Sequence, residues 1–394
     1  MGYNCISFVN GNYSIKAKAY ASGGKTAESP AINVTVDNDI KWTFMVFING
    51  DNNLDPAALD DLNEMKSAGY SNKINVVAQL DRDYSPGYWR YHLNSGGNWD
   101  ITSFEQELDF GNPNVLRDFI NWAMTSYPAS RYVLVIWDHG AGWRERRGEA
   151  IKGISYDDHG GYIDSVELAD VINSISRPIH IVGMDACLMA MVEVAYQIWG
   201  NSYFMVTSQQ TEPGDGWPYD TILGDLKTNP NMSFNELVTA IVDRYMASYV
   251  GGGVTQSAFN LAYTGTVVNR CDTLAQALRS YITSGGADAK RTITDIIGAT
   301  QCYSYTDYKD LYDFARRIKD GINNTTVDDA AQAVMDSIPS LIIREGHSGT
   351  ALTNSHGVSV WLPNTTQFGS GIASYRLLNF ALNTQWDEFL DDLY

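Results

Sequence analysis

The sequence is poor in cysteine and in basic residues. It contains four cysteines in 394 residues and no CxxC pair, which argues against a disulfide scaffold and against a zinc or redox motif. No apolar run reaches about 18 residues, so no membrane span is predicted. The first residues also lack the basic and apolar regions of a secretory signal. The 27 Lys and Arg residues are outnumbered by 46 Asp and Glu residues, and the net charge of −19 disfavours nucleic acid and favours cationic partners.

The N-terminal segment has the pattern of a β-hairpin. Residues 13–20 alternate with a period of two, Gly23 and Gly24 follow, and residues 31–36 form a second β-prone run. Two strands cannot bury a core by themselves. The segment resembles the last two strands of a bacterial immunoglobulin-like domain, so we expect residues 1–39 to be part of such a domain in a longer protein. The alternative is a hairpin that packs on the main domain.

From residue 40 the pattern changes to apolar runs that alternate with helical segments. This alternation predicts an α/β fold, a doubly wound and mostly parallel sheet with helices on both faces. Strands are expected at 42–48, 73–80, 131–137, 179–183 and 203–207, with helices at 55–65, 113–126 and 166–176. We expect a core domain over about 40–228 and a mostly helical part over about 229–394. That part has a late strand at 357–362 and helices at 233–249, 271–283, 290–299, 307–321, 326–337 and 375–393.

Two strand ends carry residues suited to nucleophilic catalysis. The third strand is followed by His139 and Gly140, and the fourth by Asp185, Ala186 and Cys187. Ligands of open α/β sheets bind beyond the carboxyl ends of the strands, so the thiol and the imidazole are expected to meet there. A Cys nucleophile needs a base such as His. The backbone N–H groups of Gly140 and Cys187 are the candidate oxyanion donors.

Other residues could fill the role of base or of a third member. His159 lies in a glycine-rich loop and is expected to be solvated, and His180 lies inside a strand and is expected to face a packed layer. Asp138 could orient the imidazole of His139, but neighbouring residues on a strand point to opposite faces. We therefore favour a dyad of Cys187 and His139.

These blocks resemble the clostripain family of cysteine peptidases, within the caspase, gingipain and legumain superfamily. The resemblance rests on residues 137–140 and 183–189, and it extends to residues 47–54, to Glu212-Pro213-Gly214 with Gly216-Trp217, and to 357–363. It covers about residues 41–394. It implies a caspase-like fold and a cysteine endopeptidase with a Cys–His dyad, here Cys187 and His139. The alternative is a non-catalytic binding module on a bacterial surface.

The resemblance also implies a specificity for basic residues. In clostripain-like enzymes, acids at the positions of Asp185 and Asp215 line the pocket for the residue before the cut bond, and two carboxylates favour Arg or Lys there. The choice between Arg and Lys stays open. Asp185 could instead cap a helix that begins near Ala186.

A basic stretch between the two blocks is a candidate for self-cleavage. Residues 144–152 hold the densest group of basic side chains in this acidic chain, and Lys152 is the first choice for the cut. The resemblance implies a zymogen, because clostripain-like enzymes and caspases are activated by a cut between these two blocks. The alternative is a solvated loop. We expect a secreted or cell-surface bacterial protein that acts as a monomer on proteins or peptides.

No cofactor is expected, and calcium is the one alternative. Asp157, Asp158 and Asp164 could offer oxygens to Ca²⁺, but their spacing matches no EF-hand. Asp51, at the end of the first core strand, either supports the site or organises the turn into the next helix.

Overall fold

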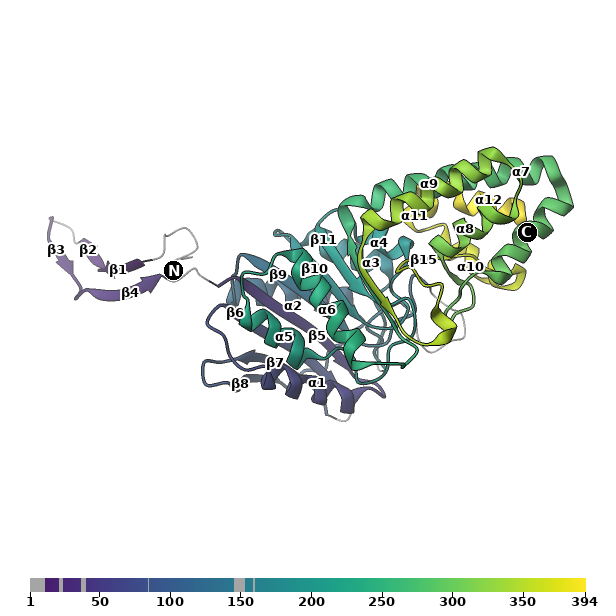
Figure 1. Cartoon of the computed structure of the whole chain (residues 1–394). Helices are drawn as coiled ribbons and strands as arrows, with labels where there is room; N and C mark the ends of the chain where they lie inside the picture. The colour runs from purple at the N-terminus through teal and green to yellow at the C-terminus, as the bar shows by residue number, and fades with distance from the viewer. Residues whose placement is uncertain (1–10, 21–23, 37–39, 84, 145–152, 159) are drawn as a thin grey trace.

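The computed structural model describes residues 11–20, 24–36, 40–83, 85–144, 153–158 and 160–394 (Figure 1). Its centre is a nine-stranded sheet with the strand order β14-β12-β11-β10-β9-β5-β6-β7-β8. The five middle strands are parallel: β5 Trp42–Gly50, β6 Ile74–Arg82, β9 Arg131–Trp137, β10 Ile179–Asp185 and β11 Ser202–Thr207. They correspond to the five strands predicted from apolar runs.

Antiparallel strands complete both edges of the sheet. On one edge lie β7 Tyr88–Leu93 and β8 Trp99–Phe104, and on the other lie β12 Thr255–Asn260 and β14 Ile342–His347. The sequence did not predict β12 or β14. The first is mostly polar although it is buried, and the second follows helix α9 without a break. Tertiary packing, not the local pattern, decides the state of both segments.

Helices cover both faces of the sheet, and alternate residues of the strands face the two layers. Met45 and Phe47 of β5 pack in one core, while Phe44 and Val46 pack in the other. The first core includes residues of α2 Pro113–Ser126, α3 Ser165–Ser174 and α4 Val192–Ile198. The second includes residues of α1 Asp55–Ser67, α5 Tyr219–Thr228 and α6 Phe234–Ser248.

The C-terminal part is mostly helical, as predicted, but its elements differ in extent. The helices expected at 271–283 and 290–299 belong to one long element, α7 Thr264–Ala299, which is kinked at Gly286, where φ is 55°. The helix expected at 375–393 is divided, and the expected late strand is β15 Ser359–Trp361, which pairs with β13 Tyr308–Asp310 outside the central sheet. The other elements are η2 Leu261–Tyr263, α8 Leu311–Gly321, α9 Thr325–Leu341, η3 Thr350–Leu352, α10 Thr365–Tyr375, α11 Asn379–Asn383 and α12 Trp386–Leu393.

The N-terminal segment forms a long hairpin that extends away from the main body (Figure 1). Strand β1 Gly11–Ile15 pairs with β4 Ile32–Val36, and β2 Lys18–Tyr20 pairs with β3 Thr26–Glu28. Apolar side chains of the hairpin are exposed, among them Ile15, Tyr20 and Ile32. Its origin in an immunoglobulin-like domain stays a prediction.

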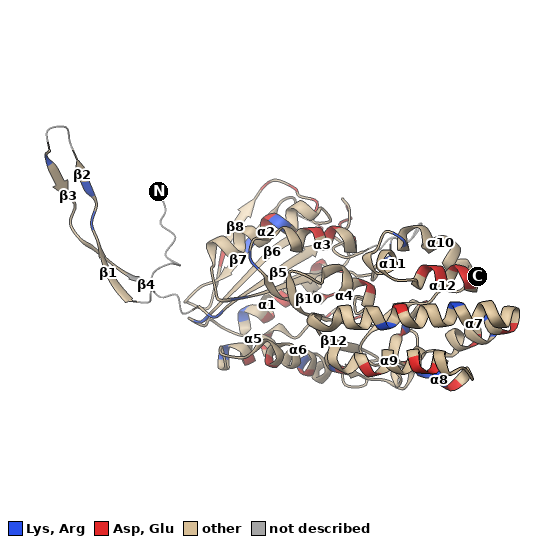
Figure 2. Ribbon diagram, turned by 90° about the horizontal axis from the view of Figure 1, so that it is seen from above, with Lys and Arg blue, Asp and Glu red and all other residues tan. Residues whose placement is uncertain are grey.

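Charge is spread unevenly over the main body. Figure 2 shows acidic residues gathered on the C-terminal helix α12. Among the described residues, no helix combines the length and the apolar character that crossing a membrane requires.

Candidate active site

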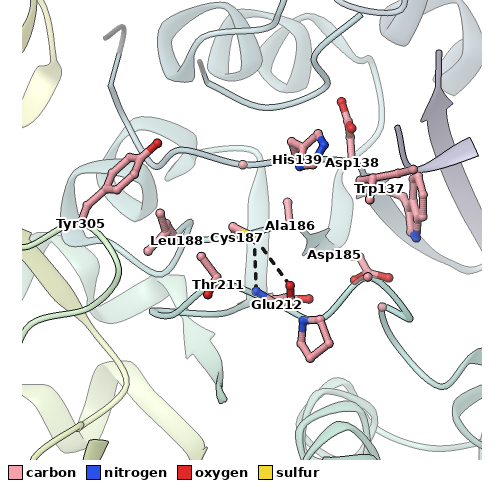
Figure 3. Close-up of a pocket in the computed structure, with 15 residues that line it drawn as sticks. Trp137, Asp138, His139, Asp185, Ala186, Cys187, Leu188, Thr211, Glu212 and Tyr305 are labelled. Carbon is pink, nitrogen blue, oxygen red and sulfur yellow. Dashed lines mark hydrogen bonds between the residues drawn. The ribbon is translucent and has the colours of Figure 1, made fainter. Parts of the chain in front are cut away.

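The catalytic candidates meet because their strands are neighbours. Strands β9 and β10 pair in parallel, with Trp137 opposite Asp185, so the segments that follow leave the sheet at the same edge. The backbone N–H of Asp138 donates to the carbonyl of Asp185 at 3.2 Å. Both His139 and Cys187 line a cavity of about 410 Å³ at this edge (Figure 3). The predicted juxtaposition of imidazole and thiol is therefore present.

Cys187 lies on a tight turn. Leu188 has a φ of 67°, which a branched side chain rarely adopts, so the backbone is held sharply bent directly after the thiol. Gly140 packs against this turn, because a Cβ at position 140 would lie 2.4 Å from the carbonyl oxygen of Cys187. The Sγ of Cys187 accepts a hydrogen bond from the backbone N–H of Glu212 at 3.3 Å. Only glycine at position 140 allows this close approach of the two strand ends.

The imidazole of His139 is oriented by an asparagine that follows β5. His139 Nε2 lies 2.8 Å from Asn53 Oδ1. With this oxygen as the acceptor, Nε2 carries the proton and Nδ1 is the nitrogen available as a base. Sequence reasoning did not single out Asn53, although its place after the strand next to β9 was a usable signal.

Both members of the candidate catalytic pair (Cys187 and His139) are shifted toward their neutral forms. Burial lowers the pKa of His139, against an opposing effect of the Asp158 carboxylate. Burial also raises the pKa of the Cys187 thiol, against the stabilising N–H of Glu212. Figure 3 shows both side chains at the cavity, with Sγ turned toward the Glu212 backbone. Both shifts favour a neutral thiol and a neutral imidazole over an ion pair of the two.

The rival candidates have other partners. His180 Nδ1 accepts from the backbone N–H of Tyr132 at 3.1 Å, and its ring stacks on Phe234, as the sequence predicted for a packed histidine. His159 lies outside the described residues. Asp138 is buried and accepts from Asn52 Nδ2 at 2.8 Å, whereas His139 Nε2 contacts Asn53.

Asp185 and Glu212 make one end of the cavity acidic. Asp185 is 5% exposed, and its Oδ2 accepts from the Trp217 N–H at 3.0 Å and from the Tyr219 hydroxyl at 2.9 Å. Burial raises the pKa of Asp185 to about 6, although these hydrogen bonds oppose the rise. Helix α4 begins only at Val192, so the alternative of a helix cap near Ala186 does not describe Asp185.

Glu212 lines the cavity together with Asp185, and the pocket role of Asp215 stays a prediction. Asp215 is exposed and is absent from the cavity lining in the described part of the chain. Glu212 lines the cavity, and its side chain is within hydrogen-bond reach of Asp185. Asp61 of α1 is 1% exposed and accepts from Trp137 Nε1. We call Asp61, Asp185 and Glu212 the acid cluster. A signal for Asp61 existed in the sequence, since it lies on the same helix face as Ala58, Leu62 and Met65.

The basic stretch is anchored at its start. Arg144 is buried and forms an ion pair with Asp307, which is also buried. Its carbonyl accepts from the N–H of Gly153 at 3.1 Å, so residues 144 and 153 are held together. Lys152 lies outside the described residues.

The acids considered for calcium have structural partners. Asp164 caps α3 through the N–H groups of Val166 and Glu167, and Asp157 accepts from the N–H of Phe110. Among the described residues, no three Asp, Glu, His or Cys side chains are grouped to hold a metal ion. Asp51 is buried, its N–H donates to Asn49 Oδ1 and its carbonyl accepts from Asp158, so it takes part in organising the turn after β5.

A comparison with known protein families identifies the family to which this chain belongs. The model of the clostripain family of peptidases matches residues 46–393. The chain belongs to the clostripain family. It is 26% identical over 396 residues to clostripain of Hathewaya histolytica, covering 82% of this chain and 75% of that one.

Solved structures of clostripain-family (C11) proteases share the fold. A secreted C11 cysteine protease from Bacteroides thetaiotaomicron, in complex with an irreversible peptide inhibitor, has a TM-score of 0.68 at 20% identity and covers 88% of this chain and 99% of its own. An inactive zymogen C11 protease from Parabacteroides distasonis has a TM-score of 0.67 at 17% identity, with 91% and 99% covered. The caspase-like α/β fold predicted from the sequence is confirmed. The protein is a cysteine peptidase, as predicted, rather than a non-catalytic binding module.

Proposed function

We propose that this clostripain-family protein is a secreted endopeptidase that cuts after Arg or Lys through a dyad of Cys187 and His139. The observation that carries the proposal is the position of the buried Asp185 in the same cavity as the pair. A buried carboxylate is stabilised by an opposing charge, and a guanidinium or ammonium group supplies it. Asp215, which is exposed, adds negative potential near this end and attracts a cation from a distance.

The chemistry follows from the positions of the two side chains. The Nδ1 atom of His139 takes the proton of the Cys187 thiol, and the thiolate attacks the peptide carbonyl. The N–H groups of Gly140 and Cys187 stabilise the oxyanion, and the imidazolium protonates the leaving amine. Water then releases the acyl group with His139 as the base. Thiol and imidazole supply every proton transfer, so the reaction needs no metal or cofactor.

Self-cleavage between the two catalytic blocks is part of the proposal. Arg144 is buried, so the cut is proposed after a basic residue among residues 145–152, with Lys152 first. The two sides of such a cut stay together, because Arg144 pairs with Asp307 and β9 pairs with β10.

Intact mass of the wild type beside the Cys187→Ala variant tests the proposal. We expect two fragments, joined under native conditions, from the wild type alone, with the break after a basic residue within 145–152. We also expect an Arg or Lys reporter peptide to be cut by the wild type and not by the variant. A wild type that cuts only after neutral residues would contradict the basic specificity, and an unbroken but active wild type would contradict self-activation alone.

A further inference from the structure

The acidic end of the cavity holds two carboxyls that face each other without a counter-charge. The side chains of Asp185 and Glu212 lie within hydrogen-bond reach. Within the described part of the chain, no other group donates to the buried Oε2 of Glu212, and Oε1 has only a long contact of 3.4 Å to Gln256 Nε2. Two ionised carboxylates at this separation would repel strongly in a buried site, and a shared proton removes the repulsion.

We propose that Glu212 is a second specificity-determining acid, which shares one proton with Asp185 in the empty cavity and releases it to water when a basic side chain enters. This inference rests on the proposed specificity for Arg or Lys. It adds that the binding of the basic side chain is coupled to the release of one proton. One bond changes: the O–H bond of the pair breaks, water takes up the proton, and the substrate cation takes the place of that proton beside two carboxylates.

The surroundings hold the proton in the empty site. Burial raises the pKa of Asp185 to about 6 and raises that of Glu212 well above its usual range, so the pair carries about one proton at neutral pH. Among the described residues, the cavity lining contains no Lys or Arg, and His139 is its only basic group. The titratable groups that interact with the pair from neighbouring elements are otherwise acids, phenols and the thiol, namely Asp61, Glu64, Cys187, Tyr219, Tyr245 and Tyr249.

Asp61 behaves differently from the pair, which makes it the matched control. Burial and the nearby Asp185 charge raise the pKa of Asp61 to about 10, so it stays protonated throughout the neutral range. The space between the two acids is open only because residue 216 is glycine. A Cβ there would lie 3.0 Å from Asp185 Oδ2 and 3.1 Å from Asp61 Oδ2. A cation that enters this space meets the ionised Asp185 and the neutral Asp61.

The test measures how the binding of butylguanidinium depends on pH. This probe carries the charge of an arginine side chain and no peptide bond, and its inhibition constant is determined against a reporter peptide with active wild-type protein. Between pH 6.5 and 8 we expect the constant to fall by up to about tenfold per pH unit, because one proton is released on binding. The Glu212→Gln variant should show less than about a twofold change over this range, since it has no proton to release. The Asp61→Asn variant should keep the wild-type slope.

Several outcomes would overturn the proposal. A flat wild-type profile, or a Glu212→Gln variant that keeps the slope, means that Glu212 releases no proton. Should the variant fail to fold, calorimetric titration of the wild type in two buffers of different ionisation enthalpy still counts the protons, and a count of zero rejects the proposal. If butylguanidinium does not inhibit and the reporter is cut only after neutral residues, the basic specificity itself fails and this inference fails with it.

Discussion

The catalytic pair and the acid cluster lie at the same cavity but are assembled in different ways. Cys187 and His139 each follow a central strand within two residues, and the pairing of β9 with β10 brings them together. The acid cluster draws on β10, on the segment after β11 and on helix α1. The proposed catalysis therefore depends on two neighbouring strand ends, whereas the proposed basic specificity depends on the packing of elements that are distant in the sequence.

The two regions also differ in charge at rest. Burial keeps the catalytic pair neutral by lowering the pKa of His139 and raising that of Cys187. In the acid cluster the same burial raises the pKa of carboxyl groups, yet the pKa of Asp185 reaches only about 6 because Glu212, Trp217 and Tyr219 donate to it. The catalytic pair is proposed to transfer a proton, and the acid cluster is proposed to bind a cation. Variants should separate the two functions.

Removing either member of the catalytic pair should have the largest effect. We expect Cys187→Ala and His139→Ala each to lower kcat by about 10⁴-fold or more, and the double variant to be no worse than either, since the two groups act as a unit. Reporter kinetics at saturating substrate measure this. The Cys302→Ser variant, which changes another free thiol, is the control and should keep its activity. Additive losses would show that the two residues do not cooperate.

Changing the acid cluster should alter selectivity more than reactivity. The Asp185→Asn variant keeps an acceptor for Trp217 and Tyr219 but loses the charge, so we expect kcat/KM for an Arg reporter to fall by about 10²- to 10³-fold. The kcat/KM of this variant for a reporter with a neutral residue before the cut bond should differ little from that of the wild type. Asp215→Asn should cost less than about tenfold, because Asp215 is exposed and its charge is screened. Equal losses of kcat/KM for the two variants would mean that Asp215 contacts the basic side chain of the substrate as closely as Asp185 does.

The sequence predicted the strand framework and the meeting of His139 and Cys187 at one cavity for a physical reason. Strands buried on both faces appear as apolar runs, and polar residues directly after them mark the edge where ligands bind. This local signal located His139, Gly140, Asp185 and Cys187 at one site. It also separated His180, which lies inside the apolar run of β10, from His139, which follows β9.

The remaining features depend on contacts that no local pattern encodes. Strand β12 is polar and becomes buried only because β11 and β14 flank it. Asp61 lies far before Asp185 in the chain, and only the packing of α1 against the sheet brings the two together. Asp215 follows the turn at Gly214 and faces solvent, while Glu212 on the same segment faces the cavity. Tertiary packing therefore determines which side chains of one loop face the cavity and which face solvent.

Asn53 links the catalytic pair to a third strand end, and its removal should have an intermediate effect. We expect Asn53→Ala to lower kcat by about tenfold, because His139 loses the hydrogen bond that fixes its ring and tautomer. Asn53→Asp keeps an acceptor, so it should restore most of the rate and move the acid limb of the pH profile upward, since a carboxylate favours the imidazolium. A purely structural role for Asn53 would leave the pH profile of both variants unchanged.

The smallest effect concerns the pH at which the catalytic pair loses activity. His139 must be neutral to take the thiol proton, and burial lowers its pKa from 6.5, so kcat should fall only as the pH drops below 6.5. The exposed Asp158 carboxylate opposes this shift, so Asp158→Asn should move the acid limb lower still, by about a few tenths of a pH unit. Since kcat is measured with the cavity occupied, titration of the acid cluster does not enter. An acid limb above pH 6.5 would mean that attraction to carboxylates and not burial governs the pKa of His139, and the contrast between a neutral catalytic pair and a charged acid cluster would then fail. An upward shift in Asp158→Asn would mean that the Asp158 carboxylate does not stabilise the imidazolium of His139.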